Sequence, residues 1–195
     1  MSKLNSITTT NGLDWNKMLG LISRLKKDKR NFEYLLIASG SYFGLRAKDL
    51  LNLKWKDILN TDNLNITESK TGKARIITIN PNLKEVFDYC KQQLIKSGNF
   101  DENNYLFPNK SGKKISIQYI NRVLHLIFEK YNFSVQNGST HTLRKTFGKR
   151  VWEVDGKSER SLIYLSQIFN HSSIQITKRY IGITQQDITN IYLSI

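Results

Sequence analysis

Apolar side chains recur at helical spacing along most of the chain. Within residues 13–27, Trp15, Met18, Ile22 and Leu25 fall on one face of a helix. Similar patterns, several of them flanked by capping residues, predict the remaining helices. The predicted ranges are 32–43, 47–54, 82–97, 116–131, 141–153, 158–169, 173–181 and 186–193.

One region has the pattern of β-strands instead. The stretches LNITES (64–69) and KARIITIN (73–80) flank the pair Thr71-Gly72, which predicts a β-hairpin. The expected fold is therefore α+β, mainly α-helical, with a small antiparallel β-sheet. With 195 residues, 39% of them apolar and 11% aromatic, the chain can fill one core. Residues 1–12 are interpreted as a linker remnant that leads into a single domain at 13–195.

The charge of the chain narrows the choice of partners. Lys and Arg number 30 against 16 Asp and Glu, a net charge of +14, which favours polyanions, above all nucleic acid. The alternative is a soluble protein that its lysines keep dispersed. The longest mostly apolar run, YLLIASGSYFGL (34–45), is too short to cross a bilayer, so no membrane partner is expected.

Cysteine and histidine usage argues against several kinds of chemistry. The single cysteine, Cys90, shares a helical stripe with Leu83 and Val86 and is predicted to be a core residue of a disulfide-free, intracellular protein. The three histidines are scattered, so no zinc cluster and no bound metal are expected. His125 lies among apolar residues of a helix, where a structural role is favoured.

A first candidate anion site lies in STHTLRKTFGKR. His141 and Arg144 are three residues apart, so they lie about 60° apart on one helix face and can point at the same phosphate. Ser139 or Thr140 can cap this helix, which would place His141 beside unpaired backbone N–H groups. The alternative is an ordinary surface pair, because H-x-x-R is a common sequence.

A second candidate lies in FGLRAKDLLNLKW and in the hairpin. Arg46 and Asp49 would share a helix face, so the carboxylate could orient the guanidinium toward a phosphate; the alternative is an exposed ion pair worth less than ~1 kcal/mol. Lys70 precedes the hairpin turn and Lys73 follows it. A hairpin tip can reach into a groove, where an ammonium could neutralise a phosphate or donate a proton. Either lysine could also be solvated surface.

The stretch NHSSIQITKRY places His171 and Tyr180 nine residues apart. An uninterrupted helix would turn about 900° between them and leave them on opposite faces. A shared site therefore requires a break. Asn170 is suited to a left-handed helix end, and Ser172 or Ser173 can cap the next helix.

These motifs follow one another in a specific order. They are G-L-R at 44–46 with an acid at Asp49, Lys70 before the hairpin turn, H-x-L-R at 141–144, H-S-S-I at 171–174, and Tyr180. Together they resemble the tyrosine recombinases, also called phage integrases, over residues 13–195. Two features depart from that family: Asn170 stands where Gly is common, and the residues before Leu13 are too few for the family's N-terminal core-binding domain, which is therefore expected to be absent from this chain.

The resemblance implies a metal-free phosphoryl transfer on double-stranded DNA. Tyr180 matches the nucleophile that forms a 3′-phosphotyrosyl link and frees a 5′-hydroxyl. Arg46 and Arg144 match the arginines that hold the non-bridging phosphate oxygens, with Asp49 as the supporting acid. Because the covalent link conserves the energy of the phosphodiester, no cofactor is required.

Three further residues complete the implied site. His141 matches the histidine that assists proton transfer, and His171 the residue that supports the phosphate and positions the tyrosine. Lys70 matches the general acid toward the 5′ oxygen, with Lys73 as the less favoured choice.

The resemblance also implies a biological setting. We expect a cytoplasmic, bacterial or phage-encoded recombinase for DNA integration or recombination, a monomer when free and a homo-oligomer, the family's tetramer, on DNA. The C-terminal segment QQDITNIYLSI (185–195) would either dock on a neighbouring protomer or pack as a last helix of its own chain. The alternative functions are a type IB topoisomerase-like nicking and closing enzyme and a non-enzymatic DNA-binding relic.

Overall fold

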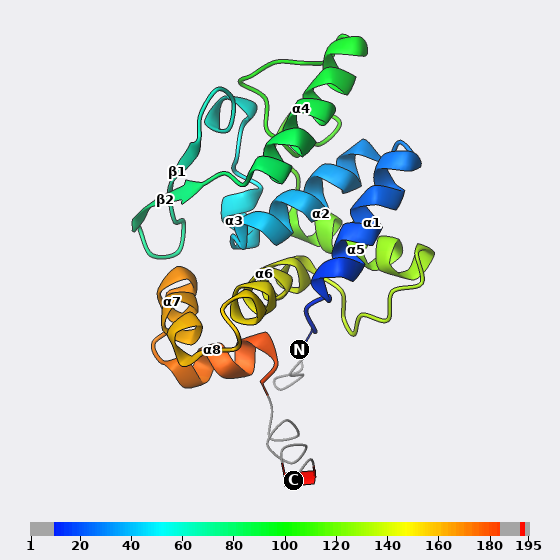
Figure 1. Cartoon of the computed structure of the whole chain (residues 1–195). Coiled ribbons are helices and arrows are strands. Elements are labelled where there is room, and N and C mark those ends of the chain that lie inside the picture. Colours follow the sequence, from blue (N-terminus) through cyan, green and yellow to red (C-terminus); the bar gives the residue numbers. More distant parts are fainter. Residues whose placement is uncertain (1–9, 184–191, 194–195) are drawn as a thin grey trace, which may run out of the picture.

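The helices lie close to the positions that the hydrophobic pattern predicts (Figure 1). The computed structural model describes residues 10–183 and 192–193. The helices in this part of the chain are α1 (Trp15–Lys27), α2 (Asn31–Phe43), α3 (Ala47–Leu50), α4 (Pro81–Lys96), α5 (Ile117–Lys130), α6 (Thr140–Val154), α7 (Glu159–Phe169) and α8 (Ile174–Ile181), with a 3₁₀ turn, η1, at Trp55–Asp57. The strands are β1 (Asn63–Thr67) and β2 (Ala74–Thr78). The predicted helix at 186–193 lies outside the described residues, apart from 192–193.

Polar caps explain why the predicted helix boundaries hold to within a few residues. The side chains of Asp14, Asn80, Ser116, Ser158 and Ser173 each accept a backbone hydrogen bond from the first turn of the helix that follows. These bonds satisfy N–H groups that have no partner inside the helix. Each such helix therefore begins where its sequence supplies an oxygen.

The predicted helix at 47–54 is wrong in its length. It ends at Leu50, because the residues that follow pair with a distant segment: the N–H of Leu106 donates to Leu53 O at 2.9 Å, and the N–H of Trp55 donates to Asn104 O at 3.1 Å. Leu53 and Trp55 are both buried. The burial of these two residues beside the distant segment outweighs the helical periodicity.

The predicted hairpin is present, but its connection is longer than predicted. The strands pair antiparallel, and the last pair in the register is Thr67 with Ala74, so residues 68–73 connect them rather than the two-residue Thr71-Gly72 turn. The Glu68 N–H donates to Lys73 O at 2.9 Å, and the Gly72 N–H donates to Glu68 O, also at 2.9 Å. Gly72 has φ +68°, a conformation that glycine adopts without strain.

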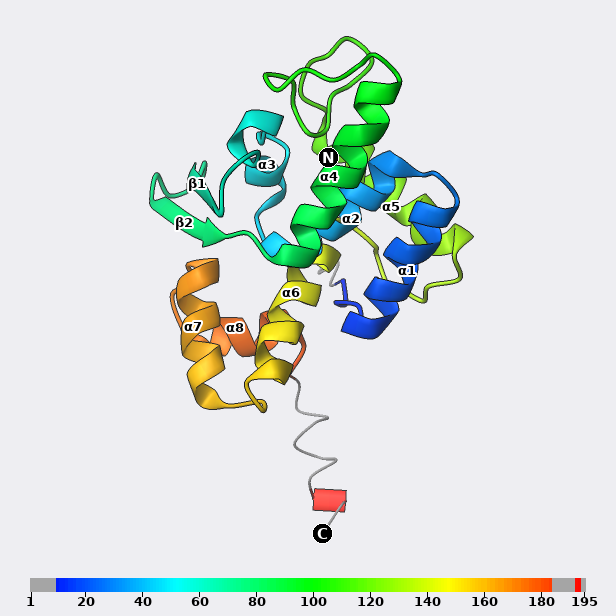
Figure 2. The ribbon, with the colours of Figure 1, turned by 45° about the horizontal axis from the view of Figure 1, so that its top comes forward.

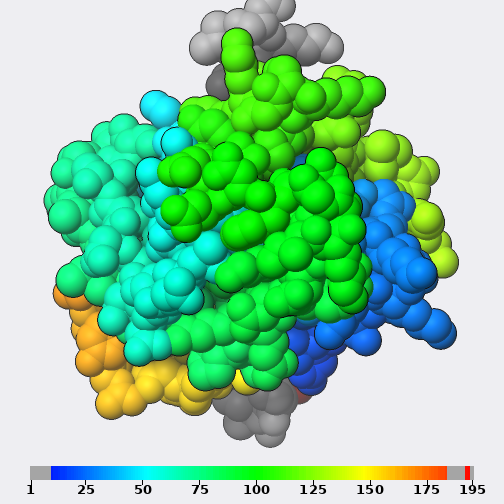
Figure 3. Space-filling model, turned by 90° about the horizontal axis from the view of Figure 1, so that it is seen from above, coloured from blue at the N-terminus to red at the C-terminus, as the bar shows by residue number. Residues whose placement is uncertain are grey.

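Helix α2 lies at the centre of the larger of the two apolar clusters that the described residues form. Helices α1, α4, α5 and α6 all pack against it (Figures 1 and 2). Seen from above, α4 covers the middle of the molecule, between the hairpin and α1 (Figure 3). We call this cluster, which extends from Leu13 to Leu143, the main core. Among the described helices, none combines the length and the apolarity that crossing a membrane requires.

The end of α2 approaches α6 very closely. A Cβ atom on Gly40 would lie 2.5 Å from the Leu143 side chain, and one on Gly44 would lie 2.4 Å from the Phe147 ring. Gly44 also ends α2 with φ +58°. The two glycines therefore allow α6 to lie directly against the segment that leads to Arg46.

Helices α6, α7 and α8 form a second, smaller apolar cluster, which we call the C-terminal cluster. Its buried residues are Leu162, Leu165, Phe169 and Ile181. The hairpin connection lies next to one end of α7 in both ribbon views (Figures 1 and 2). Thr10 and Leu13, which precede α1, are bonded to α6: the Thr10 and Thr142 hydroxyl oxygens are 2.6 Å apart, and the Leu13 N–H donates to Thr146 Oγ1 at 2.8 Å.

Candidate functional site

Two arginines converge on one backbone carbonyl. The carbonyl oxygen of Phe169, at the end of α7, accepts hydrogen bonds from Arg46 Nη2 at 2.8 Å and from Arg144 Nη2 at 3.2 Å. Arg144 also donates to Gly44 O at 2.5 Å, and its guanidinium lies 4.3 Å from the centroid of the Phe169 ring. Burial of the guanidinium lowers the pKa of Arg144 to about 10, so this side chain keeps its charge at neutral pH. Because a guanidinium has five N–H groups, both arginines retain donors for an anion.

The acid that pairs with Arg46 is Glu68, not Asp49. Arg46 Nη1 donates to Glu68 Oε2 at 2.7 Å, whereas Asp49 Oδ1 accepts the backbone N–H of Ser69 at 2.8 Å. The predicted Arg46–Asp49 contact is wrong because Arg46 precedes α3 with an extended backbone (φ −67°, ψ 148°), so the spacing of a helix face does not apply to it. Asp49 instead holds the connection of the hairpin.

The hydroxyl of Tyr180 meets a neutral histidine. His141 Nδ1 lies 3.3 Å from Tyr180 Oη. Burial raises the pKa of Tyr180 to about 12, although the charges of Arg144 and Arg46 act in the opposite direction. Partial burial, followed by the charges of Arg144 and Lys145, lowers the pKa of His141. At neutral pH the imidazole is therefore uncharged and can accept a proton.

The predicted break between His171 and Tyr180 is confirmed. Asn170 ends α7 in the left-handed conformation (φ 52°), and Ser173 caps α8 through the N–H of Ile176. His171 therefore lies at the junction, and its ring centroid is 5.2 Å from that of Tyr180. His171 Nδ1 lies 3.0 Å from the buried hydroxyl of Thr177, which fixes the ring.

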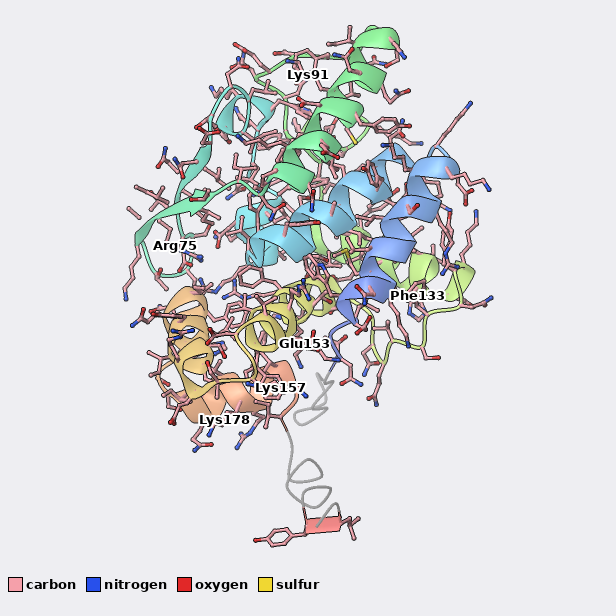
Figure 4. All side chains as sticks on the ribbon, viewed as in Figure 1. Arg75, Lys91, Phe133, Glu153, Lys157 and Lys178 are labelled. Atoms are coloured by element: carbon pink, nitrogen blue, oxygen red, sulfur yellow. The ribbon has the colours of Figure 1, made fainter. Side chains whose placement is uncertain are left out.

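The two candidate lysines differ in their surroundings. Lys73 Nζ donates to Asn170 Oδ1 at 3.1 Å, which ties the hairpin connection to the end of α7. Lys70 is exposed, and no hydrogen bond or ion pair joins its ammonium to another described residue. Figure 4 shows Arg75 on the side of the hairpin that faces α7. The hairpin connection thus borders the site, with the Lys70 side chain exposed.

The other residues considered from the sequence are Cys90 and His125. Cys90 is buried in α4, as predicted. His125 is exposed on α5, outside this cluster. Five predicted residues are brought together around the Phe169 carbonyl and the Tyr180 ring: Arg46, His141, Arg144, His171 and Tyr180 itself.

Two residues beside the site, Glu68 and Lys145, were missing from the sequence predictions. Strand alternation offers a signal for Glu68: Leu64, Ile66 and Glu68 fall on one strand face, and a charge on an apolar face implies a buried partner. Lys145 is the other residue. Its ammonium lies 5.2 Å from the centroid of the Tyr180 ring and donates to Thr10 O at 2.6 Å.

The chain is similar to known integrases in sequence. Residues 13–187 match the family model described as the phage integrase family. The probable integrase/recombinase YoeC of Bacillus subtilis (strain 168) is 39% identical over 163 residues, which cover 83% of this chain and 82% of that protein. The tyrosine recombinase XerC of Lactobacillus leichmannii is 24% identical over 76% of this chain, which spans 50% of the relative.

The fold is also similar to that of solved recombinases. The crystal structure of XerA recombinase superimposes with a TM-score of 0.71 at 22% identity, covering 94% of this chain and 64% of the other. XerH site-specific recombinase, bound to a palindromic difH substrate in a post-cleavage complex, gives a TM-score of 0.70 at 20% identity, covering 93% of this chain and 52% of that one. At these identities the likeness establishes the fold.

Proposed function

The chain belongs to the phage integrase family, and we propose that it is a site-specific recombinase whose Tyr180 cleaves and rejoins double-stranded DNA. The observation that carries this proposal is the 3.3 Å approach of Tyr180 Oη to a neutral His141, beside two arginines that share one carbonyl. A nucleophile, a proton acceptor and a cationic site for phosphate are thereby combined.

In the proposed reaction, one phosphoryl group is transferred from the 5′ oxygen of DNA to the hydroxyl oxygen of Tyr180. Tyr180 Oη attacks the scissile phosphorus while its proton passes to His141 Nδ1. The bond from phosphorus to the 5′ oxygen breaks, and Lys70 donates a proton to that oxygen. The products are a 3′-phosphotyrosyl link and a free 5′-hydroxyl, and attack by a 5′-hydroxyl reverses the steps and rejoins DNA.

The arginines have an electrostatic role in this proposal. Arg46 and Arg144 would bind the non-bridging oxygens, where negative charge accumulates in the transition state. With a pKa of about 12, only about one Tyr180 in 10⁵ is ionised at pH 7. Attack therefore depends on the transfer of the proton to His141 as the bond to phosphorus forms. His171, held by Thr177, would support the phosphate beside the tyrosine ring.

The partner and the assembly follow from the same proposal. The net charge of +14 suits a DNA backbone, and the chain spans only about half the length of curated relatives such as XerC. We therefore assign residues 13–195 the breaking and rejoining of DNA, within a homo-oligomer that forms on DNA in the cytoplasm. Phosphate contacts fix the position of such a protein, and base contacts select its site.

The central experiment is covalent capture of DNA. The protein is incubated with sheared genomic DNA of its host, quenched with detergent, and the DNA that remains linked to protein is recovered and sequenced. We expect wild type to be linked at a specific sequence with free 5′-hydroxyl ends, which accept phosphate from a kinase without prior phosphatase treatment. Tyr180→Phe should link none.

A matched variant controls for the loss of a tyrosine. Tyr164→Phe changes an exposed tyrosine of α7 and should link DNA as wild type does. Equal linkage by Tyr180→Phe and wild type would rule out Tyr180 as the nucleophile. With the recovered site in hand, exchange of strands between two duplexes identifies a recombinase, whereas relaxation of a supercoiled plasmid without exchange identifies a topoisomerase-like enzyme.

A further inference from the structure

Glu68 is a buried carboxylate just after β1, and both of its oxygens are bonded. Oε2 accepts from Arg46 Nη1 at 2.7 Å and from Thr71 Oγ1 at 2.8 Å, and Oε1 accepts from Arg75 Nη1 at 2.8 Å. The side chain is 2% exposed. Withdrawal of an ion this far from water is strongly unfavourable unless its partners are well placed. Three donors from different segments supply that compensation here.

The backbone of Glu68 also fixes the hairpin connection. Its N–H donates to Lys73 O and its carbonyl accepts the N–H of Gly72, both at 2.9 Å, so residues 69–72 form a closed turn with Lys70 near its tip. Asp49 holds the same turn through the N–H of Ser69. The position of Lys70 relative to the rest of the protein is therefore set at Glu68.

The side chain of Glu68 fixes the plane of a guanidinium. Arg46 has two bonds that restrain it, one to Glu68 and one to the Phe169 carbonyl, and together they direct its remaining N–H groups. With only the carbonyl bond left, the guanidinium could rotate about it, because the Arg46 side chain is 21% exposed. Small errors in the placement of a charged donor are costly in catalysis.

We propose that Glu68 is a positioning residue that holds Arg46 and the turn carrying Lys70 in register around one phosphate. This inference rests on the proposed function of the site. Glu68 does not touch the substrate in this scheme. Its side chain places the group that binds a non-bridging oxygen, and its backbone places the group that protonates the leaving oxygen. Arg75 neutralises the other carboxylate oxygen and so keeps the pair of bonds stable.

The test uses Glu68→Gln and three forms of the DNA site recovered by covalent capture. One form is natural DNA. A second has sulfur in place of the bridging 5′ oxygen, and because a thiolate leaves without a proton, the requirement for Lys70 is removed. A third has a neutral methylphosphonate at the scissile position, which reduces the requirement for arginine. The cleavage rate of each form is measured for wild type, Glu68→Gln and Lys70→Ala.

We expect Glu68→Gln to cleave natural DNA about 10²-fold more slowly or worse. The sulfur form and the methylphosphonate form should each restore part of that loss, since each removes one of two requirements. Lys70→Ala should respond to sulfur alone. The inference is overturned if Glu68→Gln cleaves natural DNA as fast as wild type, or if it is slower by one constant factor on all three forms, as a merely structural defect would be.

Two further variants keep this test decisive. Glu33→Gln removes the carboxylate of the Arg30–Glu33 ion pair on α2 and should leave every rate unchanged. If Glu68→Gln does not fold, Glu68→Asp keeps the charge but shortens the reach, and it should show the same pattern of partial rescue; wild-type rates for Glu68→Asp would overturn the inference. Failure of wild type to link DNA would instead refute the proposed function itself.

Discussion

The main core and the C-terminal cluster differ greatly in size. Among the described residues, the main core contains 32 buried apolar residues, whereas the C-terminal cluster contains four. Because stabilisation by burial scales with apolar area, the small cluster should open at a lower free energy than the main core. Tyr180 packs on the small cluster. The proposed nucleophile is therefore held by the less stable region.

The two regions also supply different parts of the proposed site. The main-core side contributes Arg46 and the hairpin, and the C-terminal cluster contributes His171 and Tyr180. Helix α6, which packs against α2 on one side and against α7 and α8 on the other, carries His141 and Arg144 between them. A change in how the regions meet could alter the site without unfolding the main core.

The largest effect is expected from Phe169→Ala. The Phe169 ring is fully buried and contacts the rings of Phe147, His171 and Tyr180. Truncation of a buried phenylalanine costs about 3–5 kcal/mol. In a cluster this small, that loss should separate α7 and α8 from the rest, so their amides should exchange with deuterium much faster while α1, α2 and α4 stay protected.

Phe107→Ala is the matched variant in the main core. Phe107 is equally buried and stacks edge-on against Phe32. The same chemical change should lower the urea midpoint of the whole chain instead of exposing one region. If Phe169→Ala increased exchange equally in every helix, the two clusters would have to be regarded as one cooperative unit.

The sequence predicted the small region well because its constraints are local. The break between His171 and Tyr180 follows from Asn170 and from a serine cap, which act within a few residues. The helix that carries His141 and Arg144 follows likewise from local periodicity and from Ser139 before its first turn. Local patterns therefore predicted most helices, and the resemblance to the tyrosine recombinases indicated which five residues meet at the site.

The contacts that the sequence missed are long-range. Glu68 reaches Arg46 across 22 residues, and Arg46 and Arg144 reach Phe169 across 123 and 25. No local pattern encodes such distances. The error over Asp49 came from applying helix geometry to Arg46, one residue before the helix begins.

On the main-core side, a somewhat smaller effect is expected from acid, which should lower the stability of the protein through Glu68. Burial alone would raise the pKa of Glu68, but bonds from Arg75, Arg46 and Thr71 outweigh it and lower the pKa from 4.5 to about 2. As the pH falls, the Glu68 carboxylate is therefore protonated in the unfolded chain before it is protonated in the folded chain. The charged Glu68 side chain contributes roughly 3 kcal/mol to the free energy of unfolding above pH ~4.5. This contribution is lost as the pH falls toward about 2.

Urea unfolding at pH 6 and at pH 3 measures this loss. Wild type should lose more stability between the two pH values than Glu68→Gln does, because glutamine does not titrate. The Glu33→Gln variant, whose ion pair with Arg30 lies at the start of α2 and outside the Glu68 network, should follow wild type. Parallel losses in Glu68→Gln and wild type would show that Glu68 does not hold its charge in this network.

The smallest effect should come from the junction of the C-terminal cluster, at Asn170. Its backbone is left-handed (φ 52°, ψ 53°), a conformation that costs most L-residues about 1 kcal/mol and costs glycine almost nothing. Asn170→Ala and Asn170→Gly both remove the hydrogen bond from Lys73. The difference between their free energies of unfolding therefore measures the cost of the left-handed backbone alone. We expect Asn170→Ala to be less stable than Asn170→Gly by about 1 kcal/mol, measured by urea unfolding. Because His171 follows directly, the alanine variant should also expose the amides of α8 more than the glycine variant does. Equal stability and exchange in the two variants would mean that another part of the C-terminal cluster, not this left-handed residue, sets the angle between α7 and α8.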